Sequence, residues 1–336
     1  MTSTVQLYWH CLAGSQDPNS KFAFRAEQEE RRREVVAVPH SLITPLFATA
    51  KESLLSLLTS AFENKVVYAS PASRTLAKTP KDFYMPSYED VELTTSDGKK
   101  IHGWLIKRPK EPKSVVTIIH FHGNACNISH MLYDALGMFQ KVKANILLID
   151  YRGYGLSHGS PSQEGLLLDA EAALDYVHNR HDVCDPEKIF VFGRSLGGAV
   201  AIALAEKHQA RLRGIVVENT FTSMDELVEQ LSPAFAETIT RVTTNKWNSE
   251  DTIGQIYKPI LFLSGRADEI VPCSMMTRLY RAARKSEGKE LAAFPKGKHN
   301  STCLSRGYYE TIKRFTDRIL QPPLADHAAS AHLTRI

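Results

Sequence analysis

A serine between two glycines is the residue best placed to do chemistry in this sequence. Residues 193–197 read Gly-Arg-Ser-Leu-Gly, which puts Ser195 at the centre of a Gly-x-Ser-x-Gly pattern. An apolar run precedes the pattern and a run of small residues follows it, which predicts a strand, a sharp turn and a helix. Such a turn projects the serine hydroxyl from the sheet in a strained conformation. We therefore expect Ser195 to be a nucleophile, and an inert serine in a structural turn is the alternative.

An acid and a base complete such a site, and both follow the serine in chain order. His299 comes after the last predicted strand, whereas the final two histidines of the chain fall in a polar tail. Asp268 follows a buried strand and is predicted to orient the imidazole of His299. Its neighbour Glu269 and the more distant Glu218 are the alternatives for the acid.

The charge that develops on a substrate oxygen requires backbone N–H donors. One donor is expected from Leu196, the residue after the nucleophile, and the other from the loop after an earlier strand, at Asn124 or Ala125. His122 lies on this loop, away from the strand expected to carry the base. We interpret it as a residue that orders the loop.

Alternating strand and helix patterns must position these residues. A Ser-Asp-Gly turn at 96–98 predicts a hairpin between two strands. The expected strands are Asp90–Thr95, Ile101–Lys107, Val115–Phe121, Asn145–Asp150, Lys188–Gly193, Leu212–Asn219, Pro259–Gly265 and Glu290–Pro295. The expected helices are Met131–Val142, Gln163–His178, Leu196–His208, Met275–Lys285 and Gly307–Ile319. This order predicts an α/β-hydrolase fold, with a mostly parallel central sheet and helices on both faces.

The chain divides into a tail, a domain and a second tail. Residues 1–62 form an N-terminal tail, 63–321 the α/β-hydrolase domain and 322–336 a flexible tail. Apolar residues at helical spacing over 41–63 predict an amphipathic helix, which either packs on the core or a partner, or lies on a membrane surface.

A short lid is expected at about 223–257. Met224, Leu227, Leu231 and Phe235 recur in it at helical spacing. They either line an acyl groove or pack the lid onto the domain.

Composition excludes several classes of protein. The 336 residues are 43% hydrophobic with a net charge of +4, which excludes disorder, and we find no basic stripe typical of nucleic-acid binding. The five cysteines are scattered without a Cys-x-x-Cys pair, so neither a disulfide framework nor a metal site is expected.

The expected location is the cytoplasm or the cytosolic face of a membrane. No run of eighteen apolar residues and no signal peptide is found, so no membrane-spanning helix is expected. Glycosylation sequons at Asn127 and Asn300 lie beside the expected site, where a glycan would obstruct it.

Several stretches together resemble one family. They are Phe-His-Gly-Asn-Ala at 121–125, Asp-Tyr-Arg-Gly-Tyr-Gly at 150–155, the serine turn and the start of its helix at 193–202, Glu-Asn-Thr-Phe at 218–221 and the run 294–300. Residues from about 63 to 320 resemble α/β hydrolase domain-containing protein 13 and its bud-emergence-type relatives. The resemblance implies a serine hydrolase whose triad falls on Ser195, Asp268 and His299. It also implies a hydrophobic anchor ahead of the domain and a glycine at Cys126, and the sequence departs from both. The thiol of Cys126 either makes activity sensitive to alkylation or is an inert loop substitution.

The chemistry expected is cleavage of carboxylic esters or acyl thioesters through an acyl-enzyme, without a cofactor. Related members resemble protein depalmitoylases, so an acylated protein is one expected substrate. A serine peptidase or amidase and a non-catalytic interaction scaffold are the alternatives.

Overall fold

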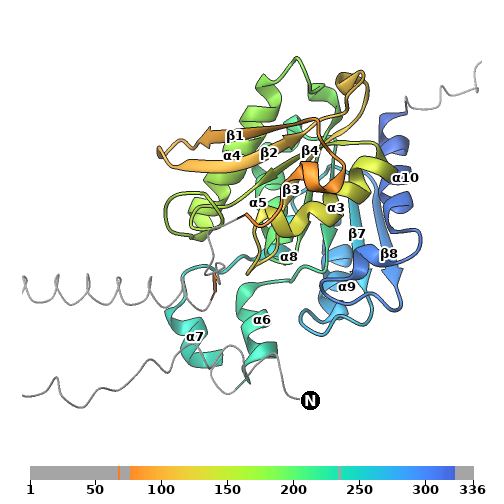
Figure 1. Ribbon diagram of the computed structural model, residues 1–336. Coiled ribbons are helices and arrows are strands. Elements are labelled where there is room, and N and C mark those ends of the chain that lie inside the picture. Colours follow the sequence, from red (N-terminus) through yellow and green to blue (C-terminus); the bar gives the residue numbers. More distant parts are fainter. Residues whose placement is uncertain (1–66, 69–75, 234–235, 322–336) are drawn as a thin grey trace, which may run out of the picture. The chain divides into compact units, whose positions relative to one another are not determined.

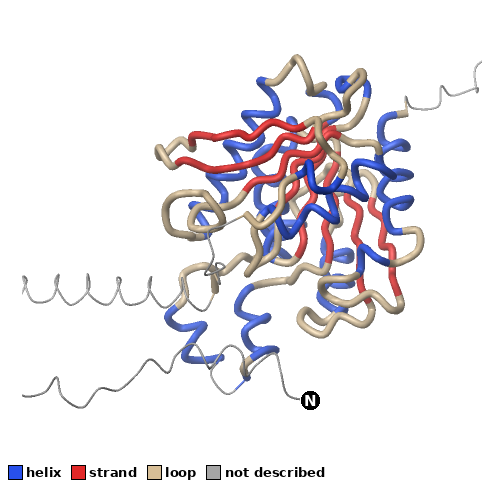
Figure 2. Tube along the Cα trace, viewed as in Figure 1, coloured by secondary structure: helices blue, strands red, loops and turns tan. Residues whose placement is uncertain are grey.

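The computed structural model describes residues 67–68, 76–233 and 236–321. The expected tails and amphipathic helix, together with Phe235, lie outside the described residues. Eight strands form one sheet (Figures 1 and 2), and they are β1 (Tyr88–Thr94), β2 (Lys100–Ile106), β3 (Thr117–Phe121), β4 (Asn145–Ile149), β5 (Ile189–Arg194), β6 (Gly214–Glu218), β7 (Ile260–Gly265) and β8 (Lys289–Phe294).

The strands lie in the order β1-β2-β4-β3-β5-β6-β7-β8. β2 pairs antiparallel with β1 and β4, and every pair from β4 to β8 is parallel. The predicted hairpin and the mostly parallel sheet are therefore confirmed. The carboxyl ends of β3, β5, β6, β7 and β8 meet at one edge of the sheet, where open α/β sheets bind their ligands.

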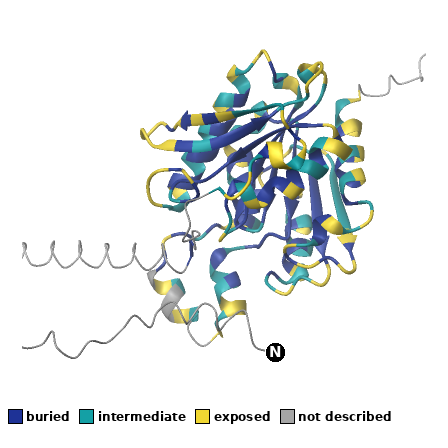
Figure 3. Cartoon of the chain, in the orientation of Figure 1, coloured by how far each residue is buried: buried dark blue, intermediate teal, exposed yellow. Residues whose placement is uncertain are grey.

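Side chains of the strands alternate between two apolar layers, because successive residues of a strand point to opposite faces. On one face, Ile119, Val191 and Val217 lie in a core with the apolar sides of α4 (Gln163–Asn179), α5 (Leu196–His208) and α9 (Cys273–Ala282). On the other face, Ile118 and Phe192 lie in a core with α3 (Leu132–Gly137) and α10 (Tyr308–Leu320). Figure 3 shows the buried sheet between these helices.

The segment expected as one helix over 131–142 consists of short helices of different geometry. A 3₁₀ turn (Ile128–Met131) leads into α3, and a π-helical turn (Met138–Val142) follows it. Apolar residues three to four positions apart fit all three geometries, so the pattern alone does not separate them. A Cβ atom at Gly137 would lie 2.0 Å from the ring of Tyr309, so glycine lets α10 approach this segment.

The segment between β6 and β7 contains α6 (Met224–Leu231), α7 (Ala236–Val242) and α8 (Ser249–Ile253). Met224 and Leu227 are buried in the core that also contains α4, α5 and α9, whereas Leu231 is 53% exposed. The first two residues of the expected apolar stripe therefore pack the segment onto the domain. Among the described residues, no helix is both long and apolar enough to cross a membrane.

Candidate active site

The predicted turn at Ser195 connects β5 to α5. Ser195 has φ 54° and ψ −119°, a strained conformation for a residue with a side chain. Its neighbours leave no space for side chains. A Cβ atom at Gly193 would lie 2.0 Å from the carbonyl oxygen of Gly197, and one at Gly197 would lie 2.1 Å from that of Phe121. The first contact lies within the turn itself and the second lies against the end of β3, and together they explain both glycines of the motif.

The structure brings Asp268 and His299 together from two different loops. His299 Nδ1 lies 2.9 Å from Asp268 Oδ2, and the two side chains are 6% and 0% exposed. The other carboxylate oxygen, Oδ1, accepts the backbone N–H groups of Ile270 and Val271 at 2.9 Å each. These bonds hold the carboxylate toward the imidazole before any substrate binds.

The two alternative acids face elsewhere. Glu269 is exposed, and its carboxylate accepts the backbone N–H of His299 at 3.3 Å. Glu218 is fully buried and accepts Arg194 Nε and Tyr308 Oη, each at 2.8 Å. Burial raises the pKa of Glu218 above its ordinary value. Among the described residues, Asp268 is the carboxylate that hydrogen-bonds the ring of His299.

The loop after β3 lies beside the turn. A Cβ atom at Gly123 would lie 3.6 Å from the Cβ atom of Ser195, which places the following residues next to the nucleophile candidate. Leu196, the other expected source of a donor, is buried at the start of α5. Backbone N–H groups at a helix start carry partial positive charge, which suits a developing oxyanion.

The two candidate donors on this loop differ in what they already bind. The N–H of Ala125 donates to the side-chain Oδ1 of Asn124 at 3.0 Å, and Tyr154 Oη donates to the same oxygen at 2.8 Å. Asn124 Nδ2 donates to the carbonyl oxygen of Val67 at 2.8 Å. Because the Ala125 N–H is engaged, the backbone N–H of Asn124 is the better donor candidate.

His122 is buried below this loop. Its Nδ1 donates to the carbonyl oxygen of Gly123 at 2.7 Å, and its ring centroid lies 4.3 Å from that of Tyr151. Burial lowers the pKa of His122, which favours the neutral imidazole. These contacts agree with the interpretation of His122 as a residue that orders the loop.

Cys126 is partly buried, and burial raises the pKa of its thiol. Since the thiolate is the form that reacts with alkylating agents, this raised pKa favours the inert interpretation of Cys126.

Asn219 and Thr220 contact the site although sequence reasoning gave them no role. Asn219 donates to the carbonyl oxygen of His299 at 3.1 Å, and Thr220 donates to that of Ser195 at 2.7 Å. Both residues belong to a stretch that carries the family resemblance, and that was the one signal available. Sequence reasoning also gave no role to Val67, whose contact with the loop after β3 joins residues far apart in the chain.

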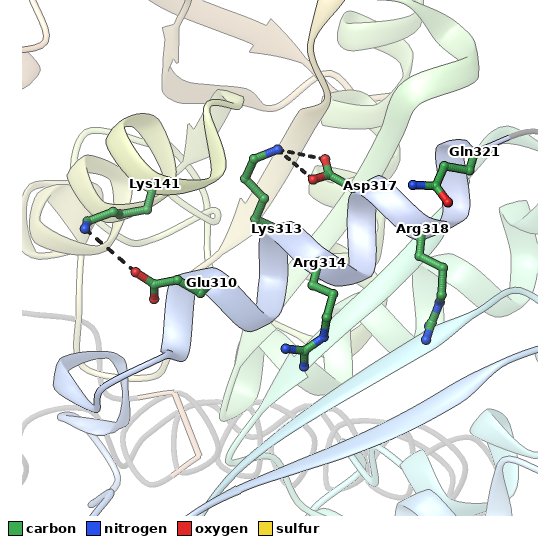
Figure 4. A pocket seen from close by; sticks show the side chains of 7 residues that line it. All are labelled: Lys141, Glu310, Lys313, Arg314, Asp317, Arg318 and Gln321. Carbon is green, nitrogen blue, oxygen red and sulfur yellow. Dashed lines mark hydrogen bonds and ion pairs between the residues drawn. The ribbon is translucent and has the colours of Figure 1, made fainter.

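A hollow on the outer side of α10 is lined by charged side chains (Figure 4). Two ion pairs lie in this hollow. Lys141 Nζ lies 3.7 Å from Glu310 Oε1, and Lys313 Nζ lies 2.8 Å from Asp317 Oδ2. It contains none of the candidate site residues. Within the described ranges, no group of three or more metal-ligating side chains is found.

The parallel sheet, the strained serine turn and the Asp268–His299 pair at one sheet edge define an α/β hydrolase. A family model described as serine aminopeptidase, S33, matches residues 110–252. Among solved structures, the esterase Pf2001 of Pyrococcus furiosus superposes with a TM-score of 0.61 at 25% identity, covering 75% of this chain and 97% of that one.

Two relatives identify the family within the α/β hydrolases to which this chain belongs. Protein bem46 of Schizosaccharomyces pombe is 41% identical over 76% of this chain and 85% of its own length. The α/β hydrolase domain-containing protein WAV2 of Arabidopsis thaliana is 39% identical over 77% of this chain and 88% of its own. The chain belongs to the bem46 family of α/β hydrolases, as its motifs predicted.

Proposed function

We propose that this protein is a serine hydrolase that cleaves carboxylic esters or acyl thioesters through an acyl-enzyme on Ser195. The observation that carries the proposal is the Asp268–His299 hydrogen bond at the sheet edge that also carries the strained serine. The likeness to an esterase structure supports ester cleavage.

The roles follow from ordinary acyl-transfer chemistry. His299 takes the proton of Ser195 Oγ as the oxygen attacks the acyl carbon, and Asp268 holds the imidazole and stabilises its charged form. The N–H groups of Leu196 and Asn124 stabilise the oxyanion. His299 then gives the proton to the leaving alcohol or thiol, and the acyl-enzyme remains.

Water completes the cycle. It attacks the acyl carbon while His299 takes its proton, and the carboxylic acid leaves as Ser195 Oγ is reprotonated. The chemistry uses only protein groups and water.

An acylated protein on the cytosolic face of a membrane is the substrate class we propose. The resemblance of related family members to protein depalmitoylases supports this, and so does Leu231, an exposed apolar residue on α6 that is available to an acyl chain. Cleavage of amides is the second candidate, because the matching family model is described as a serine aminopeptidase.

Fluorophosphonate labelling of the purified protein tests the proposal. We expect the wild type to be labelled, Ser195→Ala to be unlabelled, and turnover of p-nitrophenyl esters to fall by about 10⁶ in that variant. Ser114→Ala, at an exposed serine in a surface turn, is the matched control and should behave as wild type. No labelling of folded wild type would overturn the proposal.

A substrate series then separates the candidates. Acyl thioesters and p-nitrophenyl esters of increasing chain length are compared with aminoacyl amides. Faster turnover of long-chain thioesters supports deacylation of proteins. Preferential cleavage of the amides would instead establish the peptidase activity.

A further inference from the structure

Three consecutive residues at the carboxyl end of β6 contact the backbones of both the nucleophile and the base. We refer to Glu218–Thr220 as the β6 clamp. We propose that Asn219 and Thr220 are positioning residues that set the placement of Ser195 relative to His299. This inference rests on the proposed function, because it concerns residues assigned there to the triad.

On the nucleophile side, the clamp binds both polar groups of the Ser195 backbone. The N–H of Ser195 donates to the carbonyl oxygen of Glu218 at 2.9 Å, and Thr220 Oγ1 donates to the carbonyl oxygen of Ser195 at 2.7 Å. The N–H of Thr220 donates to Met276 Sδ on α9 at 3.3 Å, which anchors the clamp from a second side. A residue in strained backbone conformation persists only when its surroundings fix it in this way.

On the base side, one side chain holds the loop that carries the imidazole. Asn219 is 1% exposed, and its Nδ2 lies within hydrogen-bonding distance of the carbonyl oxygens of His299 at 3.1 Å and Lys298 at 3.3 Å. It also lies 3.0 Å from Thr302 Oγ1, three residues beyond the histidine. Asn219 Oδ1 accepts the N–H of Gly265 at 2.8 Å, at the end of β7 just before the loop that carries Asp268.

The backbone of the clamp is itself unusual. Asn219 has φ 46°, in the left-handed region that asparagine tolerates better than most residues. The clamp therefore joins the nucleophile turn to the acid and base loops through three adjacent residues. A displacement of reacting groups by 1 Å can reduce a rate about 100-fold, so such a connection bears directly on turnover.

A purely structural role makes a different prediction. If Asn219 and Thr220 only join β6 to its neighbours, their loss lowers the melting temperature and leaves turnover per folded molecule unchanged. If they position the triad, kcat falls while KM for a small ester stays close to wild type, since substrate binding is not altered.

The test uses full-length Thr220→Val and Asn219→Ala, with Asn219→Asp retaining the acceptor for Gly265. Thr222→Val is the matched control, because Thr222 Oγ1 donates to Glu226 on α6 at 2.6 Å and not to a triad loop. We expect kcat for p-nitrophenyl acetate to fall about tenfold in each clamp variant, and Asn219→Asp to resemble Asn219→Ala. The double variant should lose less than the product of the single losses, because both residues fix the same geometry.

A second readout needs no activity. The Nδ1–H proton of His299 gives a downfield NMR signal when it donates to Asp268, and we expect this signal to shift or broaden in Asn219→Ala but not in Thr222→Val. If folded wild type fails to react with fluorophosphonate, the proposed function fails while this signal still tests the clamp. Unchanged kcat in all three single clamp variants and an unchanged signal in Asn219→Ala, at reduced melting temperature, would overturn the proposal.

Discussion

At the scale of single residues, the site depends on a carboxylate whose orientation is fixed before substrate arrives. Asp268 accepts two backbone N–H groups on one oxygen and the imidazole of His299 on the other. Electrostatic groups that are already oriented contribute most to catalysis, because no reorganisation is needed during the reaction. The choice between Asp268 and its neighbour Glu269 is therefore open to a direct test.

We expect Asp268→Asn to reduce kcat by about 10⁴, because an amide leaves the imidazole in the wrong tautomer. Glu269→Gln is the matched neutral substitution one residue away. It should reduce kcat less than about tenfold, since Glu269 contacts only the backbone N–H of His299. Steady-state hydrolysis of a p-nitrophenyl ester measures both. Similar losses in the two variants would contradict the assignment of Asp268 as the acid.

At the scale of elements, Val67 and Tyr68 connect two parts of the domain that lie far apart in sequence. Tyr68 Oη donates to Asn245 Oδ1 at 2.9 Å and accepts Trp247 Nε1 at 3.0 Å, just before α8. The carbonyl oxygen of Val67 accepts Asn124 Nδ2 from the loop after β3. These two residues thus link the stretch between α7 and α8 to the candidate oxyanion loop.

Tyr68→Phe should lower the free energy of unfolding by about 1–3 kcal/mol, because it removes hydrogen-bond partners from buried polar groups. Urea denaturation measures the change. Tyr84→Phe, at a position 85% exposed, is the control and should leave stability unchanged. Equal stabilities of the two variants would show that the buried hydroxyl contributes nothing.

At the scale of the whole molecule, stability depends on a histidine inside the core. His120 on β3 is fully buried, is stacked on Phe192, and has no hydrogen-bond partner for either ring nitrogen in the part of the chain described. Burial, with help from the nearby positive charge of Arg194 and from His122, lowers the pKa of His120 to about 3, against the opposing charge of Asp134. The folded protein therefore holds this imidazole neutral.

This lowered pKa predicts the direction of a pH dependence. The unfolded chain binds a proton at His120 below its ordinary pKa of 6.5 whereas the folded chain does not, so stability is lost as the pH falls from 6.5 toward about 3. One proton corresponds to about a tenfold change in the unfolding equilibrium per pH unit. Between pH 6.5 and 4, we expect His120→Leu to reduce the slope of the unfolding free energy against pH by the amount that the uptake of about one proton contributes.

Urea denaturation at a series of pH values between 6.5 and 4 measures this slope. His158→Leu, at an exposed histidine, is the control and should keep the wild-type slope. A slope unchanged by His120→Leu would mean that His120 is protonated equally in the folded and unfolded chains.

The sequence by itself determined the sheet and the class of fold. It also proposed Ser195 and His299 as nucleophile and base, and Asp268 as the acid with Glu269 and Glu218 as alternatives. Strand and helix periods, turn residues and the glycines around the serine are local signals, so they can be read without knowing which segments meet. The family motifs added further local signals, and the comparisons confirmed the family.

Tertiary structure decided the rest, because hydrogen bonds join residues that are distant in the chain. It selected Asp268 over Glu269 and Glu218 as the partner of the imidazole, and it showed that Asn124 already engages the N–H of Ala125. It also brought the β6 clamp onto the backbones of Ser195 and His299. No local pattern encodes these contacts, since each depends on where separate strands end along one edge of the sheet.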